Sequence, residues 1–171
     1  DSLEEVHFCG GTADIHKFFD QILRPMVYKL AESAGMPPHI LGAYSRFLED
    51  LKVYNSLAGG VGHAYRRECG IPQGCPFSMM MVALIMRPWL KLMTMMGVRP
   101  RVLADDVLIM ADGTHMLAKF AKALNATHSY LHDLGARIAP AKSFNFASTE
   151  QSRAWLSNTL WPVIDTSIEV C

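Results

Sequence analysis

The chain of 171 residues is predicted to fold as one α+β domain, a small antiparallel sheet with helices packed on one face. Three observations lead to this prediction. Strand-like and helix-like segments alternate along the chain, which is typical of a sheet covered by helices. Half of the residues are hydrophobic, enough for a substantial core. Two neighbouring aspartates, Asp105 and Asp106, interrupt the apolar run 102–111 and indicate a hairpin that turns at acidic residues.

The first third of the chain is expected to form one strand and two helices. Residues 6–15 form the predicted strand, and residues 20–34 form a helix that tolerates Pro25 in its first turns. Residues 35–38 contain one glycine and two prolines and end that helix. An amphipathic pattern predicts the second helix at residues 39–51.

The remaining elements follow from similar local patterns. Residues 53–57 and 63–69 are expected to be strands joined by the glycine-rich turn 58–62, which lacks the Gly-Lys-Ser/Thr of a phosphate loop. The later elements are a buried helix at 78–96 kinked near Pro88, the acidic hairpin at 101–111, a helix at 114–134, an extended segment at 136–146 and a strand at 161–170.

Three carboxylates are the candidate metal ligands. Asp14 follows an extended stretch, so it lies near the end of a strand, where ligand sites of open sheets are favoured. The pair Asp105–Asp106 sits in an apolar frame, where carboxylates are costly to bury unless a cation accompanies them. Mg²⁺ prefers such hard oxygen ligands, and two ions could act together in an in-line displacement. Taken alone, Asp14 is better explained as a strand-end or N-cap aspartate than as a metal ligand.

Four segments in this order resemble motifs of the reverse transcriptases, particularly those of non-LTR retrotransposons and group II introns. The segments are the Asp-x-x-x-Phe-Phe-Asp block from Asp14, the Gly-Ile-Pro-Gln-Gly block from Gly70 to Ser78, the Ala-Asp-Asp block at 104–106, and the Gly-then-Lys segment 135–142. The resemblance extends from about residue 9 to about residue 146. It implies a polymerase palm, a partial reverse transcriptase fold over residues 1–171, with basic fingers missing before it and a thumb missing after it.

The resemblance implies template-directed DNA synthesis from an RNA template. A DNA primer would be extended with dNTPs by two-metal nucleotidyl transfer, with two Mg²⁺ ions for which Mn²⁺ is able to substitute. Two alternatives stay open. One is another palm-type polymerase that uses RNA templates, and the other is a non-catalytic, domesticated palm that acts as a nucleic-acid or protein-binding scaffold. As an excerpt, the chain is expected to be inactive alone.

The resemblance also assigns roles to residues around the carboxylates. Asp14 and Asp105 would bridge the two metals, Asp106 would have a supporting metal or structural role, and Ile15 would offer only its backbone carbonyl. Phe19 is expected to lie under the nucleotide sugar and exclude a 2′-hydroxyl, with an ordinary core aromatic as the alternative, which is also the interpretation of Phe18.

Further roles are expected in the middle and late segments. Gln73 and Gly74 would contact the incoming nucleotide and let the backbone approach the template. Lys142 resembles the family lysine suggested to protonate pyrophosphate, and a surface lysine is the alternative. Ser78 is interpreted as the N-cap of the following helix, and Asp20 as an N-cap or an ion-pair partner. Arg66 and Arg67 would either touch template phosphates or form a solvated face.

Two local features set limits on these expectations. Leu103 stands where the family usually has Tyr or Phe, so primer grip, fidelity and processivity are in doubt. His128 and His132 have metal-ligand spacing but lack the glutamate of a His-Glu-x-x-His site, and they are interpreted as a helix surface.

Composition bounds the partners and the location. The 16 basic and 16 acidic residues give a net charge of zero, unlike most nucleic-acid binders, which is expected if basic segments are missing. The longest apolar run is expected to be too short to cross a membrane, and the acidic first residues lead us to expect no secretory signal. The four cysteines form no Cys-x-x-Cys pair, so reduced thiols and an intracellular location are expected, with nucleus and cytoplasm not distinguished.

Overall fold

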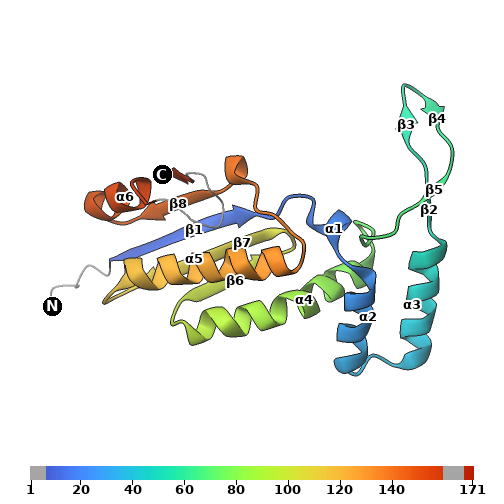
Figure 1. Ribbon diagram of the computed structural model, residues 1–171, viewed down its shortest axis with the longest axis horizontal. Coiled ribbons are helices and arrows are strands. Elements are labelled where there is room, and N and C mark those ends of the chain that lie inside the picture. The colour runs from blue at the N-terminus through green and yellow to red at the C-terminus, as the bar shows by residue number, and fades with distance from the viewer. Residues whose placement is uncertain (1–6, 160–167) are drawn as a thin grey trace. The chain divides into compact units, whose positions relative to one another are not determined.

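The structure is a computed structural model that describes residues 7–159 and 168–171. The chain divides into two compact units, the first made of Asp1–Phe18 with Met86–Cys171 and the second of Phe19–Ile85. The first unit contains a five-stranded sheet, and the second contains helices and a protruding hairpin (Figure 1). Each unit is described by itself.

The sheet of the first unit has the strand order β6-β7-β1-β8-β9. These strands are β6 (Arg99–Leu103), β7 (Asp106–Asp112), β1 (Phe8–Asp14), β8 (Phe144–Ala147) and β9 (Glu169–Val170). All neighbours are antiparallel except β8 and β9, which run parallel. The predicted first strand and the acidic hairpin are therefore confirmed. Of the strand predicted at 161–170, residues 161–167 lie outside the described residues.

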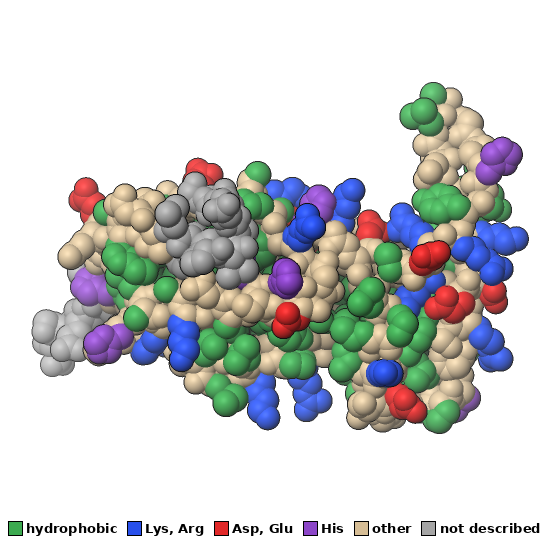
Figure 2. Space-filling model, in the orientation of Figure 1, with side chains coloured by type: hydrophobic (Ala, Val, Ile, Leu, Met, Phe, Trp, Pro, Cys, Tyr) green, Lys and Arg blue, Asp and Glu red, His purple; other side chains and the backbone are tan. Residues whose placement is uncertain are grey.

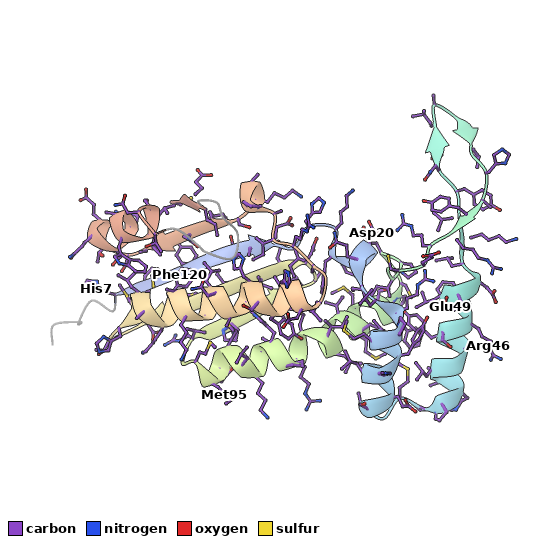
Figure 3. All side chains as sticks on the ribbon, viewed as in Figure 1. His7, Asp20, Arg46, Glu49, Met95 and Phe120 are labelled. Carbon is purple, nitrogen blue, oxygen red and sulfur yellow. The ribbon has the colours of Figure 1, made fainter. Side chains whose placement is uncertain are left out.

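Alternation along the strands divides the sheet into a covered face and an open face. On β7, Val107, Ile109 and Ala111 are at most 2% exposed, and they point toward the covered face. That face packs against helix α5 (Met116–Asp133), whose Phe120 is labelled over the strands in Figure 3. Burial of this apolar stripe holds the helix on the sheet.

Helix α4 (Pro76–Met95) is a largely apolar helix with Pro88 inside it. It begins two residues earlier than predicted. Within its second half, the Trp89 indole donates a hydrogen bond to Thr127 Oγ1 of α5 at 2.9 Å, and both residues are fully buried. Helix α4 is long and apolar enough to cross a membrane, and the core helices of soluble proteins meet the same criterion.

The second unit begins with two helices where one was predicted. The segment 20–34 is split into α1 (Phe18–Gln21) and α2 (Arg24–Ser33), with Leu23 extended between them. Pro25 explains the split, because its ring would clash with the carbonyl of Gln21 in a continuous helix. In α2 it takes the second helical position, where its missing N–H costs nothing.

Helix α3 (Pro38–Asp50) confirms the second predicted helix and packs beside α2. Glu49, labelled in Figure 3, links the two helices. Its carboxylate accepts a hydrogen bond from the Tyr28 hydroxyl at 2.8 Å and lies 3.5 Å from Nη1 of the buried Arg24.

A long hairpin follows α3. Its stem pairs β2 (Lys52–Val53) with β5 (Tyr65–Arg66), and its tip pairs β3 (Ser56–Leu57) with β4 (Gly60–Val61). The tip turns at Ala58 and Gly59, which both have positive φ (48° and 83°), as a type I′ turn requires. The hairpin was predicted, but with longer strands and a longer turn.

Two late elements differ from the expected extended segment. A 3-10 helix, η1 (Pro140–Lys142), interrupts residues 136–146 before β8 begins. Helix α6 (Glu150–Ser157) was not predicted. Its N-cap is Thr149, whose hydroxyl accepts a hydrogen bond from the Ser152 amide at 3.2 Å.

Candidate active site

The end of β1 places two candidate carboxylates side by side. In the antiparallel register Asp14 lies directly opposite Asp106 of β7. Side chains of register partners emerge on the same face of a sheet, with Cβ atoms about 4.5–5.5 Å apart. Thr12 and Leu108 are also register partners, so this is the open face, away from α5.

Asp105 lies in the tight turn between β6 and β7. Leu103 pairs with Asp106, so only Ala104 and Asp105 form the turn. Ala104 has a φ of 55°, a left-handed conformation that costs a non-glycine residue about 1 kcal/mol. The Ile15 amide donates a hydrogen bond to the Asp105 carbonyl at 2.9 Å, which ties the turn to the end of β1.

The segment around η1 holds the same end of β1 from the other side. The Ala139 amide donates to the Asp14 carbonyl at 2.8 Å, and the Asp14 amide donates to Ser143 Oγ at 3.3 Å. Lys142 Nζ consequently lies 3.7 Å from Asp14 Oδ2. This ion pair is worth little by itself, because the Lys142 side chain is 72% exposed.

A pocket of about 510 Å³ adjoins this carboxylate pair on the open face. It is lined by side chains of β1, β6, β7, β8 and η1, among them Thr12, Arg101, Leu103, Asp106, Lys142 and Phe144. Leu103 is 72% exposed, so the residue that replaces the usual aromatic ring projects into solvent.

The second unit holds the other predicted contacts together by its backbone. Ile71 donates its amide hydrogen to the Phe19 carbonyl at 2.8 Å. Gly70 has a φ of 84°, and a Cβ there would lie 2.9 Å from the Phe19 carbonyl oxygen. Only glycine therefore fits between the segment that carries Gln73 and helix α1.

The three predicted residues of the second unit differ in their exposure to solvent. Phe19 is 8% exposed, so it is largely buried. Gln73 is exposed, and Gly74 has a φ of 83° with no neighbour within 4 Å of an added Cβ. The Gln73–Gly74 turn is thus an open surface that another molecule can approach.

A buried arginine at this turn was not predicted. Arg24 is 2% exposed, and its Nε donates to the Gly70 carbonyl at 2.9 Å. It connects α2 to the Gly70–Ile71 segment and fixes the path toward Gln73. In the sequence Arg24 looks like an ordinary helix-start residue, and only the folded chain shows its partners.

Three further predictions are settled by local contacts. Ser78 is not an N-cap: it lies inside α4, fully buried, and its hydroxyl donates to the Pro72 carbonyl at 2.7 Å. Asp20 is an ion-pair partner, as expected, and its partner is Arg67. Phe18 is 2% exposed and belongs to the core, as expected.

The interpretation of the two histidines as a helix surface is wrong for one of them. His128 is 5% exposed, and its Nε2 has no hydrogen-bond partner among the described residues. Burial lowers its pKa to about 4. His132 is exposed, as expected. The period of α5 places His128 on its inner face together with Leu124 and Leu131.

The predicted site residues therefore fall into two groups. Asp14, Ile15, Asp105, Asp106 and Lys142 meet at one end of the sheet in the first unit. Phe19, Gln73 and Gly74 belong to the second unit.

The three aspartates of the first unit have oxygen donors of the kind that a magnesium site uses. Two aspartates are register partners and a third occupies the adjoining turn, and oxygen ligands of this kind suit Mg²⁺. In the side-chain positions of the described residues, no three His, Cys, Asp or Glu groups gather into a metal-binding cluster. The backbone brings the three aspartates to the same end of the sheet.

Comparison with known proteins identifies the family and the fold of this chain. The family model described as reverse transcriptase (RNA-dependent DNA polymerase) matches residues 7–160. The chain belongs to the reverse transcriptase family. No curated protein matches the chain by sequence.

A solved telomerase shares the fold. The structure of telomerase from Candida tropicalis, in complex with the TWJ fragment of telomeric RNA, superposes with a TM-score of 0.64 at 11% sequence identity. The match covers 85% of this chain and 26% of the telomerase chain. The α+β fold is therefore that of a polymerase palm, a part of the reverse transcriptase fold.

Proposed function

We propose that this chain is the catalytic palm of an RNA-directed DNA polymerase, which extends a DNA primer with dNTPs on an RNA template. The observation that carries the proposal is the register of β1 and β7, which sets Asp14 opposite Asp106 with Asp105 in the adjoining turn. Phosphoryl transfer depends mainly on positioning and charge neutralisation, and three carboxylates at one sheet end are suited to hold metal ions that would supply both.

Asp14, Asp105 and Asp106 would hold two Mg²⁺ ions, for which Mn²⁺ is able to substitute. Bound there, the ions would neutralise charge on the triphosphate and favour ionisation of the primer 3′-hydroxyl. The chain's own contribution is rigidity. The Ile15 amide fixes Asp105 through its carbonyl, and Ala139 and Ser143 fix the backbone of Asp14. Ile15 would add only its own backbone carbonyl.

Lys142 is placed for a role in leaving-group chemistry. Its Nζ lies 3.7 Å from Asp14 and its side chain is mostly exposed, so it can turn between the carboxylate and a bound pyrophosphate. At Nζ it would hold the proton that the leaving group takes up. A lysine in this place also limits repulsion between the carboxylates before substrate binds.

The second unit would supply the nucleotide contacts. Gln73 and Gly74 form the exposed turn that we assign to the incoming nucleotide and the template, and Phe19 is assigned to the sugar. A ring at that place excludes a 2′-hydroxyl and so selects deoxynucleotides.

The finer classification is part of the proposal. The motif order and spacing support a polymerase of the non-LTR retrotransposon or group II intron type, in which fingers and thumb complete the enzyme. The 26% coverage of the telomerase chain agrees with a palm that is one part of a larger polymerase. All four cysteines are free thiols, which supports an intracellular location.

The test is primer extension by the full-length protein on an RNA template with Mg²⁺, comparing dNTPs with rNTPs. We expect DNA synthesis, and we expect Asp14→Asn, Asp105→Asn and Asp106→Asn each to lower its rate by about 10²-fold or more, since each removes a charged ligand. Asp112→Asn is the matched control. Asp112 lies at the other end of β7, paired with Arg99, so this variant is expected to keep full activity.

Two results would contradict the proposal. One is primer extension that survives in all three variants. The other is the absence of any product, with dNTPs or rNTPs, from folded protein that binds RNA, which would favour a non-catalytic scaffold.

A further inference from the structure

The hairpin of the second unit has an unusual composition. Residues 51–67 contain no Asp or Glu, but they contain Lys52, His63, Arg66 and Arg67, together with two tyrosines. In a chain whose net charge is zero, this is a local excess of positive charge. Cations interleaved with aromatic rings are typical of surfaces that bind nucleic acid.

The hairpin is also the most exposed apolar feature of its unit. Leu57 and Val61 at the tip are 86% and 71% exposed, and Tyr54 on the stem is 55% exposed. Figure 2 shows hydrophobic side chains at the tip and Lys and Arg side chains gathered around the base. A two-stranded hairpin has little stability of its own, so exposed rings and aliphatic groups on it suggest a binding role.

The register places two of the cations beside each other. Lys52 and Arg66 are cross-strand partners in the stem, so they emerge on one face. Tyr54 follows directly after β2, two residues after Lys52 in the chain, and is 55% exposed. The other ring, Tyr65, is held by a hydrogen bond from its hydroxyl to Asn55 Oδ1 at 3.2 Å. Tyr54 is the ring left open to a stacking partner.

The base of the hairpin is fastened to the predicted nucleotide-binding turn. Arg67 forms an ion pair with Asp20 of α1, and the Cys69 thiol donates to the Asp20 carbonyl at 3.3 Å. The chain then continues through Gly70 to Gln73. A second acidic partner also lies at this base: Arg66 Nη2 is 3.5 Å from Asp50 Oδ1, with both side chains largely exposed. Such an exposed pair is weak and can give way to a phosphate.

We propose that the hairpin at residues 52–67 binds a single strand of nucleic acid, the RNA strand in the proposed reaction. Lys52 and Arg66 contact phosphates and Tyr54 stacks on a base, while the Leu57–Val61 tip packs against the strand. This inference extends the proposed function, because it assigns a stretch of the template path beyond the catalytic carboxylates. A protein partner with an apolar surface matches the hairpin less well, because such a surface would offer no anion to Lys52 and Arg66.

The experiment measures binding without chemistry. Fluorescence anisotropy of the full-length protein with a labelled single-stranded oligouridine would be recorded from 50 to 300 mM NaCl. Tyr54→Ser is expected to weaken binding about 5- to 50-fold, the range for one lost base stack, whereas Tyr54→Phe keeps the wild-type affinity. The double variant Lys52→Gln with Arg66→Gln is expected to reduce the slope of log K against log salt by about 1 to 2.

Two controls separate this inference from the proposed function. Lys122→Gln removes an exposed cation of α5 in the other unit and is expected to leave the affinity and the salt slope unchanged. Asp105→Asn abolishes synthesis under the proposed function but leaves oligouridine binding intact, so a failure of catalysis and a failure of the hairpin give different results.

The inference is overturned if Tyr54→Ser and the double variant, with wild-type circular dichroism, bind oligouridine with unchanged affinity and unchanged salt dependence. It is likewise overturned if those variants alter only the molar mass in light scattering, because the hairpin would then be a protein–protein contact.

Discussion

Burial alters the chemistry of His128. A neutral imidazole fits the inner face of α5, but an imidazolium there loses its hydration and gains no partner at Nε2 among the described residues. The lowered pKa of about 4 follows from this burial. Folding therefore favours the neutral form of this side chain.

The pH dependence of stability tests this burial. Between pH 6.5 and 4, the unfolded chain binds a proton at His128 and the folded chain does not, so stability falls as the pH falls through this window. Above pH 6.5 the His128 side chain is neutral in both states and does not lower the free energy of unfolding. By pH 4 that free energy has fallen by up to about 3 kcal/mol. Urea unfolding of His128→Leu is expected to show a smaller loss over that window than wild type.

The control for this measurement is His132→Leu, since His132 lies one turn further on and is exposed. Its pH profile is expected to match that of wild type. If the profile of His128→Leu also matched, the side chain would be hydrated in solution and the buried placement would be wrong.

At the scale of elements, the close contact of α5 with β1 requires a glycine, Gly11, in the strand. A Cβ at Gly11 would lie 2.9 Å from Phe120 Cζ and closer still to Asn145 Oδ1, and both of these residues are at most 1% exposed. Neither neighbour has room to move, because it is packed on all sides.

Gly11→Ala is therefore expected to destabilise the first unit by about 1–3 kcal/mol, through overpacking of the helix against the sheet. The matched variant is Gly42→Ala in α3, where an added Cβ has nothing within 4 Å. Replacing a glycine inside an exposed helix is expected to stabilise by about 0.5–1 kcal/mol. Urea unfolding of both variants measures the difference, and equal effects would contradict the packing described.

The elements that the sequence predicts well are those with a strong pattern. Strand β1 was predicted as an extended stretch that ends near Asp14, and the acidic hairpin from the apolar residues on both sides of Asp105 and Asp106. Helix α6 was missed because it is short and buries only Ser152 and Leu156. Its one usable signal was the capping hydroxyl of Thr149.

The site was predictable as a set of residues but not as an arrangement. Family motifs identify Asp14, Asp105 and Asp106, and the roles assigned to them stay predictions. Strand register is a tertiary property, so the sequence alone could not show that Asp106, rather than Asp105, faces Asp14. The role of Arg24 was hidden for the same reason, since its partner lies 46 residues away.

At the scale of the whole molecule, the four thiols report on the two units separately. Cys9 lies in the central strand β1, fully buried, and burial raises its pKa to about 11. Cys69 is exposed in the second unit. The thiolate is the reactive form of cysteine. Burial therefore protects Cys9 in two ways, because it keeps reagents away from the sulfur and keeps the thiol protonated.

We expect a thiol reagent at pH 8 to label Cys69 and Cys171 quickly and Cys9 only when the sheet opens. Mass spectrometry of labelled peptides over a urea series would give the opening free energy of the first unit from Cys9. Rapid labelling of Cys9 in native buffer would contradict its place in the core.

The hydrogen bond from the Ile15 amide to the Asp105 carbonyl is formed entirely by main chain. It therefore places the acidic turn whatever side chain occupies position 103, which projects into solvent. For directed evolution, this makes position 103 a site to randomise: a library there samples aromatic, aliphatic and polar contacts to a bound strand, while the backbone that presents the aspartates stays the same in every member.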